Sequence, residues 1–406
     1  MVSQNTFHGL TIIGVRTAIL LLLACLAAAR GQERAFSVVN FGARGDGTTD
    51  DTKAFEQAWA ATCGARGPSA TLHVPANRSF LVGPTTFHGP CTSARVTVQV
   101  LGTITAPPST SAAWKWSDYW LMFQQVRGLT VTGGSAGVLD GRGQTWWPRK
   151  CKRNGCLVVA PTALKLVSCD GLELSYLSSK DSPQMHIVVS TSRGVNMTHL
   201  TITAPGDSPN TDGIHLDRSE GVQITGSTIG TGDDCVSIGS GTRFVTVDGL
   251  VCGPGHGVSV GSLGRKGSNA AVEYIDVRNV HFINTSNGAR IKTWLGGQGY
   301  ARSISFTDIK FTNVDHPVVI NQFYVDRAIQ SMGGVAIRNI TYTNLNGTSS
   351  QKTAVAFDCS ESGSCTGIHV NSMAITGTDG QATVARCQNV QGDTSGNVSP
   401  HIPCLG

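Results

Sequence analysis

Three aspartates in two short segments of the chain could perform acid–base chemistry. Asp212 lies in SPNTDGIHLDRS, and Asp233 and Asp234 lie together in GTGDDCVSIGSG. Carboxyl groups can divide the cleavage of a glycosidic bond, because one protonates the leaving oxygen while another activates water or attacks the sugar. Crowding raises the pKa of at least one of them, since like charges at short range resist joint ionisation. One aspartate could therefore remain an acid at mildly acidic pH.

One histidine and two cations follow the aspartates in sequence. His256 lies in GPGHGVSVGSLG, and Arg290 and Lys292 lie in NGARIKTW. On a strand, Arg290 and Lys292 would point to the same face while Ile291 points into the core. Fixed cations suit a substrate that carries carboxylates. This alternation therefore indicates a site for an anionic substrate.

The spacing of these residues predicts how they come together. Asp212, Asp234 and His256 are separated by 22 residues and by 22 again. On a parallel β-helix, residues at matching positions of successive coils stack about 4.8 Å apart. We therefore expect these three side chains to form a column on one face.

The rest of the sequence has the character that such a fold requires. Short alternating strands rich in Val, Ile and Thr run from about Val96 to Asp358, separated by turn residues. Similar segments, such as GVNMTHLTI and GVQITGSTI, recur every 22 to 30 residues or so. Glycine is abundant, at 49 of 406 residues, and charged residues make up only 14%. The sequence thus predicts a single all-β solenoid.

A helix is expected only near the start of this solenoid. The segment from about Asp51 to Thr62 is amphipathic, with Asp50 or Asp51 as its cap. Phe55, Ala58 and Trp59 fall on one face. Such a helix would cover the open end of the solenoid core.

The first residues are typical of an export signal, which we place at 1–31. The apolar run Thr17 to Ala29 is thirteen residues long, whereas a membrane-spanning helix needs about 20. We therefore expect a secreted mature protein, 32–406, with one domain and no membrane anchor.

The cysteines indicate an oxidising compartment. Twelve are present, and removing Cys25 with the signal leaves eleven. Cys169, inside an apolar segment, is then expected to be a buried free thiol. Local spacing suggests five disulfides: Cys63–Cys91, Cys151–Cys156, Cys235–Cys252, Cys359–Cys365 and Cys387–Cys404.

Four motifs together resemble the polygalacturonases, glycoside hydrolase family 28, in their plant form. They are NTD (210–212), GDD (232–234), GHG (255–257) and RIK (290–292), in that order. Further similarity lies in FGARGDGTTDDTKAF, LDGRGQTWW, SPQMH and INQFY, so the resemblance covers essentially the whole mature chain. It implies a right-handed parallel β-helix that hydrolyses de-esterified pectin in the plant cell wall without a cofactor or metal.

The resemblance also implies a role for each matching residue. Asp233 would be the general acid, and Asp212 and Asp234 would hold and activate the attacking water. His256 would tune or orient the acid. The residues expected to contact the galacturonate are Arg290, Lys292 and Tyr324, with Asn210 and Asn321 as further candidates. His186 of SPQMH and the basic stretch 148–156 are more typical of structural and solvated residues.

The spacing of the aspartates and the family resemblance predict different stereochemistry for the reaction. Inverting carboxyl pairs are usually about 6.5 to 9.5 Å apart, whereas adjacent coils would set Asp212 and Asp234 closer together. Spacing alone favours retention. The resemblance implies inversion, which requires Asp233 to lie farther from the water than the two bases lie from each other.

Several alternatives remain open from the sequence. The enzyme could cut inside the polymer, which segments such as WWPRKCKRNGC favour, or trim its ends. A pectate lyase would need a cation and an arginine base, and a pectin-binding wall protein would need no intact acids. Two departures from the plant pattern, Asn321 and Val325, bear on substrate affinity rather than on reaction type.

The formal charge of +5 is too weak to name a partner. We expect a monomer that binds pectin and neither nucleic acid nor membrane, with room for an inhibitor protein at the cleft.

Overall fold

The computed structural model describes residues 34–406 except 116, 135, 148–158, 325–332 and 364. The predicted export signal, the predicted Cys151–Cys156 bridge, the basic stretch 148–156 and Val325 lie outside the described residues. Across the part of the chain that the structure describes, no helix combines the length and hydropathy that crossing a membrane requires.

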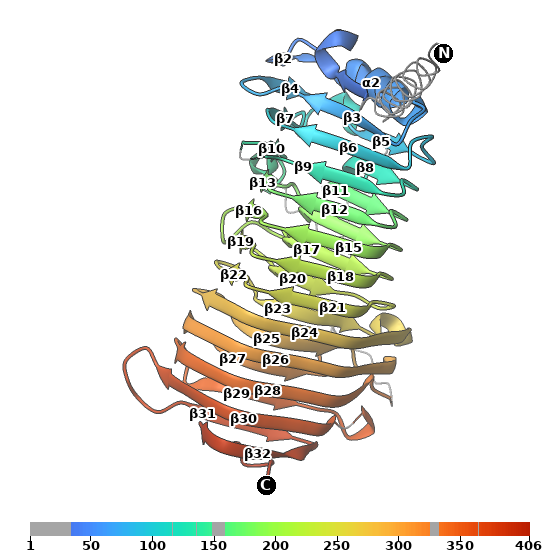
Figure 1. Ribbon diagram of the computed structural model, residues 1–406. Helices are drawn as coiled ribbons and strands as arrows, with labels where there is room; N and C mark the ends of the chain where they lie inside the picture. Colours follow the sequence, from blue (N-terminus) through green and yellow to red (C-terminus); the bar gives the residue numbers. More distant parts are fainter. Residues whose placement is uncertain (1–33, 116, 135, 148–158, 325–332, 364) are drawn as a thin grey trace, which may run out of the picture.

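The chain winds into a tall stack of coils whose strands pair in parallel with those of the next coil (Figure 1). The predicted all-β fold, a parallel β-helix with a short N-terminal helix, is confirmed. The described strands form two sheets that run the length of the stack. The sheet that carries the site contains β5 (Thr85–His88), β8 (Tyr119–Gln124), β11 (Thr162–Val167), β14 (Ile187–Ser190), β17 (Ile214–Asp217), β20 (Val236–Ile238), β23 (Val258–Leu263), β25 (Asn287–Thr293), β27 (His316–Asn321), β29 (Thr353–Asp358) and β31 (Val384–Gln388).

The second sheet forms the remaining walls of the coils, and most coils give it two short strands or one long strand. It contains β1 (Arg34–Ser37), β2 (Asp46–Asp50), β3 (Ser69–Val74), β4 (Ser79–Leu81), β6 (Arg95–Val100), β7 (Thr103–Thr105), β9 (Leu129–Thr132), β10 (Val138–Asp140), β12 (Leu172–Ser175), β13 (Ser178–Lys180), β15 (Arg193–Thr198), β16 (Thr201–Thr203), β18 (Glu220–Thr225), β19 (Thr228–Gly230), β21 (Arg243–Asp248), β22 (Val251–Cys252), β24 (Asn269–Ile283), β26 (Gln298–Val314), β28 (Ala336–Ser349), β30 (Cys365–Gly377) and β32 (Val390–Ser399). Short 3₁₀ turns are η1 (Val38–Phe41), η2 (Ala112–Trp114), η3 (Gly143–Thr145), η5 (Arg265–Gly267) and η6 (Glu361–Gly363).

The core is a set of stacked aliphatic columns. Ile214, Val236 and Val258 occupy matching positions in β17, β20 and β23, and all three are fully buried. Because successive side chains of a strand point to opposite faces, burying these residues forces the next residue of each strand outward. The interior packing therefore determines which residues line the outer face of this sheet.

The helix α2 (Thr52–Gly64) lies over the first coils (Figure 1). Its predicted apolar face is confirmed, because Phe55, Ala58 and Trp59 are buried. The ring of Phe55 packs edge-on against Phe80, with centroids 5.6 Å apart.

The predicted cap of this helix is only partly right. Asp51 is the N-cap residue, but its side chain accepts hydrogen bonds from the backbone amides of Arg44 and Gly45, at 2.7 and 3.0 Å, instead of from the helix. Asp50 accepts from the amide of Thr52 at 3.0 Å. Asp51 therefore ties the preceding loop to the helix start.

Four of the predicted disulfides are confirmed: Cys63–Cys91, Cys235–Cys252, Cys359–Cys365 and Cys387–Cys404. Cys169 is a buried free thiol, as expected. Burial raises the pKa of this thiol to about 11, so it stays protonated and unreactive at ordinary pH.

Candidate active site

Three consecutive coils bring the sequence-predicted residues together. Asp212, Asp234 and His256 each stand two residues before a strand, and the register of β17, β20 and β23 aligns those strands at intervals of 22 residues. The backbone follows the same register, since the amide of Gly213 donates to the carbonyl of Asp234 at 2.9 Å. The expected column is thus present in the backbone.

Asp234 is the most enclosed acid of the cluster and carries two cationic partners. Lys292 Nζ donates to Asp234 Oδ2 at 2.7 Å, and Arg290 donates to Oδ1. The side chains of Asp234, Arg290 and Lys292 are only 2%, 13% and 9% exposed. Charge-assisted bonds from two cations compensate a negative charge on this carboxylate. Ile291, between the cations, is fully buried, as the alternation predicted.

Asp212 is also buried, with 7% of the residue exposed, but has no cation bonded to it among the described residues. Ser237 Oγ donates to its Oδ2 at 2.8 Å. Burial, together with the charges of Asp233 and Asp234, raises the pKa of Asp212 to about 8. At mildly acidic pH the cluster therefore retains a proton, and in the substrate-free site it resides on Asp212 rather than on Asp233.

Asp233 is the acid that solvent reaches most readily, with 19% of its side chain exposed. His256 Nδ1 lies 3.0 Å from its Oδ1, and the exposed Asn210 donates to its Oδ2 at 3.4 Å. Burial works to raise the pKa of Asp233, but the hydrogen bond and charge of His256 hold it below its ordinary value. Asn210 therefore contacts Asp233. From the sequence, Asn210 was expected to contact only the substrate.

Ligand atoms of Asp233, Asp234 and His256 lie within 4.8 Å of one another, a grouping that could hold a metal ion. Both oxygens of Asp234 already receive bonds from Arg290 and Lys292. A cation added there would meet two fixed positive charges, so the electrostatics favour an anionic ligand over a metal.

Tyr324 lies beside the cations, just after β27. Its ring centroid is 5.4 Å from Lys292 Nζ and 5.8 Å from the ring of Trp294. The residue is 39% exposed. It therefore extends the cationic part of the site with a ring that a ligand can contact.

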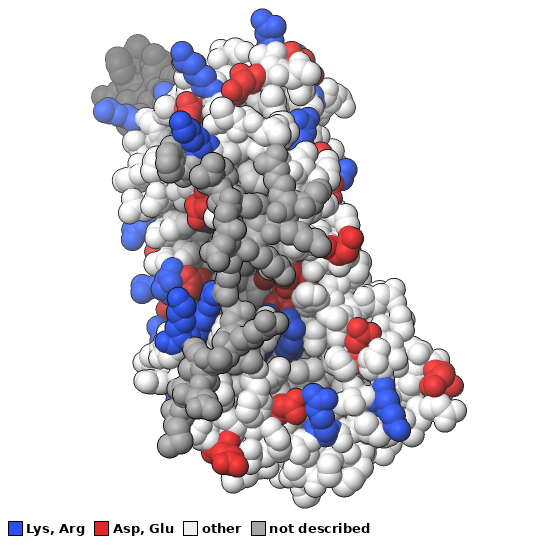
Figure 2. Space-filling view, turned by 180° about the vertical axis from the view of Figure 1, so that it is seen from behind, with Lys and Arg blue, Asp and Glu red and all other residues white. Residues whose placement is uncertain are grey.

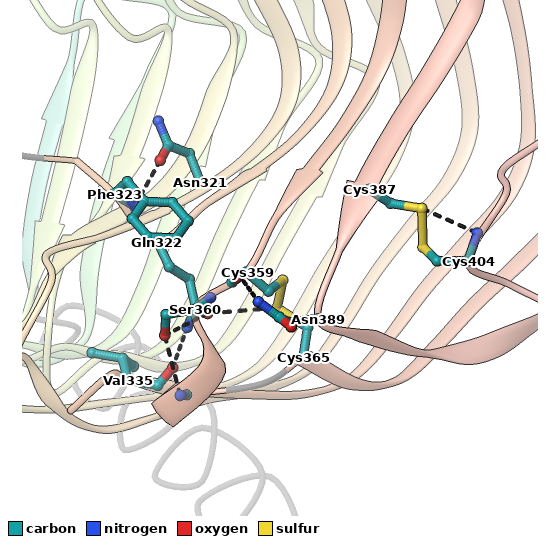
Figure 3. Close-up of a disulfide and its surroundings, with 11 residues drawn as sticks. Asn321, Gln322, Phe323, Val335, Cys359, Ser360, Cys365, Cys387, Asn389 and Cys404 are labelled. Carbon is teal, nitrogen blue, oxygen red and sulfur yellow. Dashed lines mark hydrogen bonds between the residues drawn. A yellow bond between two sulfur atoms is a disulfide. The ribbon is translucent and has the colours of Figure 1, made fainter. Parts of the chain in front are cut away.

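Gln322 anchors the segment that bears this tyrosine, although the sequence did not single it out. Its amide nitrogen donates to the carbonyl of Val335 at 2.7 Å, and its amide oxygen accepts from the backbone of Ser360 at 2.8 Å. Figure 3 shows the side chain pointing down between these partners, near the Cys359–Cys365 bridge. The end of β27 is thus tied to two later segments.

His186, the other histidine considered, lies inside the coil. It is fully buried, its Nδ1 is 2.8 Å from Ser179 Oγ, and burial lowers its pKa to about 3. It is therefore a neutral core residue, and its backbone amide, rather than its ring, meets the acid segment by donating to the carbonyl of Asp212 at 2.8 Å.

Sequence reasoning missed Ser237, Ser259 and His215, which surround the aspartates on the outer face. Ser259 Oγ donates to Asp234 Oδ1 at 2.8 Å, and His215 Nδ1 lies 2.8 Å from Ser237 Oγ. A signal was present, because His215, Ser237 and Ser259 are also separated by 22 and 22 residues.

On the face opposite to that of Figure 1, acidic and basic side chains gather near mid-height (Figure 2).

The chain matches the family described as "Glycosyl hydrolases family 28" over residues 63–398. It is 41% identical to "Polygalacturonase-2" of Solanum lycopersicum over 382 residues, which cover 92% of this chain and 81% of that protein. Its fold resembles an endo-xylogalacturonan hydrolase from Aspergillus tubingensis, with a TM-score of 0.76 and 25% identity over 90% of this chain and all of the other. An exopolygalacturonase from Thermotoga maritima gives a TM-score of 0.74 at 22% identity, covering 90% and 93% of the two chains.

Proposed function

The chain belongs to family 28 of the glycosyl hydrolases, and from this premise we propose that it hydrolyses α-1,4-galacturonosyl linkages of de-esterified pectin. One observation carries the proposal. One of the three clustered aspartates, Asp234, is bonded to two largely buried cations, Arg290 and Lys292. The acids suit glycosidic cleavage, and the cations suit a sugar that bears a carboxylate.

In the proposed reaction Asp233 gives its proton to the glycosidic oxygen as the bond to the anomeric carbon breaks. Water held between Asp212 and Asp234 attacks that carbon, and its proton passes to Asp212. Asp233 suits the first role because it is the most accessible acid. The sugar carbon is inverted, because water attacks from the side opposite to the leaving group.

The substrate-free site holds the number of protons that this scheme needs, but on a different aspartate. Catalysis needs one proton on Asp233 and none on Asp212, whereas the raised pKa of Asp212 places one proton there. The two arrangements hold the same number of protons. We infer that substrate moves the proton, because the glycosidic oxygen accepts a hydrogen bond near Asp233 while the water donates one near Asp212.

We propose that Arg290, Lys292, Tyr324 and Asn210 contact the galacturonate. Lys292 lies between Asp234 and the ring of Tyr324. A substrate carboxylate arriving there would meet a cation already desolvated by its surroundings, which strengthens the attraction. His256 would orient Asp233 through the bond that joins them.

We further propose that the protein is exported through a signal at residues 1–31 and secreted to the cell wall. The mature protein would be a monomer with a single domain. Several disulfides support an oxidising destination. An inhibitor protein that docks on the cleft is a further proposed partner.

We propose endo action, and one experiment tests it together with the reaction. Viscosity and reducing ends are followed in the same sample of de-esterified polygalacturonate with a chelator present. A steep fall in viscosity with few new ends supports an endo-hydrolase, and ends that rise without this fall indicate exo action. If neither the viscosity nor the number of reducing ends changes, the result contradicts the proposed hydrolase activity. Proton NMR of the first product tests inversion, which predicts the β-anomer.

A further inference from the structure

We propose that Ser237 and Ser259 are positioning residues, each of which donates its hydroxyl proton to the active-site aspartate of the preceding coil and so fixes the orientation of that carboxylate. The inference rests on the proposed function, because it assigns these serines to the aspartates that would hold the water. Neither serine belongs to the motifs that define the acids or the cations.

The geometry of the two contacts is the same. Ser237 Oγ donates to Asp212 Oδ2 at 2.8 Å, and Ser259 Oγ donates to Asp234 Oδ1 at 2.8 Å. In both pairs the serine follows its aspartate by 25 residues. Both serines are buried, at 2% and 0% exposure. A buried hydroxyl satisfied by a carboxylate holds one rotamer of each partner.

The strands explain why the contact recurs. Ser237 pairs with Ser259 in the register of β20 and β23, and each lies between two fully buried aliphatic residues that point into the core. Each serine must therefore point outward, over the face that carries the aspartates. A hydroxyl is short enough to lie beneath a carboxylate without filling the site.

The donors around each serine set the direction of its proton. Arg290 Nε lies 2.8 Å from Ser259 Oγ, and a guanidinium can only donate. Ser259 therefore accepts from Arg290 and turns its own proton to Asp234. His215 Nδ1 lies 2.8 Å from Ser237 Oγ, and a histidine ring nitrogen can donate or accept according to its tautomer. When Asp212 is ionised it can only accept, so Ser237 donates to it and His215 donates to Ser237.

The two serines are not expected to matter equally. Asp234 also receives Arg290 and Lys292. Ser237 is the one side-chain donor to Asp212 in the part of the chain that the structure describes. Removing the Ser237 hydroxyl would leave this carboxylate free to turn away from the water, whereas Asp234 would stay held by its cations.

The test compares Ser237→Ala and Ser259→Ala with Ser227→Ala. Ser227 is a matched control because it is buried to 2%, lies on the coil of Asp212, and bonds only backbone groups in another corner. We expect Ser237→Ala to lower kcat by about 10- to 100-fold with KM changed less than about threefold. Ser259→Ala should lower kcat by less than about tenfold, and Ser227→Ala should leave it unchanged.

A pH profile separates positioning from a loss of stability. The Ser237 hydrogen bond lowers the pKa of Asp212, so its removal should move the basic limb of kcat/KM, where the free enzyme loses the single proton of the cluster, to higher pH. The other charged groups facing Asp212, namely Asp233, Asp234 and Lys292, stay in place in this variant, as does His215. Ser237→Thr, which keeps a hydroxyl, should recover at least part of the lost kcat.

A kcat and pH profile for Ser237→Ala equal to those of Ser227→Ala would overturn the inference. If Ser237→Ala does not fold, Ser237→Cys decides the same point, because it keeps a similar volume with a much weaker donor; an unchanged kcat there contradicts positioning. Failure of this inference is distinguishable from failure of the proposed function, since in the second case the wild type itself does not hydrolyse polygalacturonate.

Discussion

The coils of Asp212 and Asp234 place the same kind of residue in the same position with different charge surroundings. Both aspartates precede matching strands, both are buried, and both accept from a serine 25 residues later. Asp234 is bonded to two cations from β25, whereas Asp212 has a pKa raised to about 8. The repeating backbone thus places both aspartates in the same geometry, while cationic side chains from a later coil determine which of the two carries the negative charge.

The largest effect should come from breaking this comparison at Asp234. Asp234→Asn should lower kcat by on the order of 10³-fold and destabilise the protein by about 3–5 kcal/mol, because Arg290 and Lys292 would lose a buried partner. Steady-state kinetics and denaturant unfolding measure the two losses. Unchanged stability in this variant would show that the cations do not depend on Asp234.

Asp212→Asn should lower kcat similarly but change stability in the opposite direction. The pKa of Asp212 is raised in the folded state from its ordinary value of 3.8 to about 8. The folded protein then holds a proton that the unfolded chain releases, so this contribution is present below about pH 4 and is lost as pH rises toward 8.

The asparagine variant does not titrate, so its melting temperature should exceed that of the wild type by a margin that grows from pH 4 to pH 8. Thermal melts at several pH values measure it, with Asp234→Asn as the matched comparison. A margin that does not vary with pH would contradict the assigned charge state of Asp212.

A smaller effect is expected at Lys292, the cation between Asp234 and Tyr324. Lys292→Ala should raise KM for polygalacturonate by roughly 10- to 100-fold through the lost ion pair with substrate. Stability should fall much less than in Asp234→Asn, because Arg290 still compensates the carboxylate. Lys292→Arg, which keeps the charge, is the control, and an unchanged KM for Lys292→Ala would remove this residue from substrate binding.

The smallest effect should appear at Tyr324. Tyr324→Phe keeps the ring beside Lys292 and should change KM less than about threefold, whereas Tyr324→Ala should raise it by roughly threefold to tenfold. Equal KM values for the two variants would show that the ring itself contributes nothing.

The sequence predicted the features that the coils of Asp212 and Asp234 share better than the features in which they differ. The 22-residue spacing of Asp212, Asp234 and His256 foretold their stacking, because a strand register repeats once per coil. The pairing of Arg290 and Lys292 with Asp234 could not be foreseen, since it depends on how far long side chains reach between coils. The same holds for Asp51, whose carboxylate turns to the preceding loop instead of capping its helix.

The serines illustrate the other limit. Ser237 and Ser259 follow the same period as the acids, yet serine on a strand carries no chemical signal until its neighbours are known. Only the register and the 2.8 Å contacts distinguish them from ordinary surface serines.

The central claim is that Asp233 supplies the proton for hydrolysis of polygalacturonate, and Asp233→Asn tests it most directly. The substitution keeps the volume and removes the proton donor, so reducing-end release should fall by about 10²- to 10⁴-fold while the melting curve stays close to that of the wild type. Near-normal release by a folded Asp233→Asn variant would contradict the account.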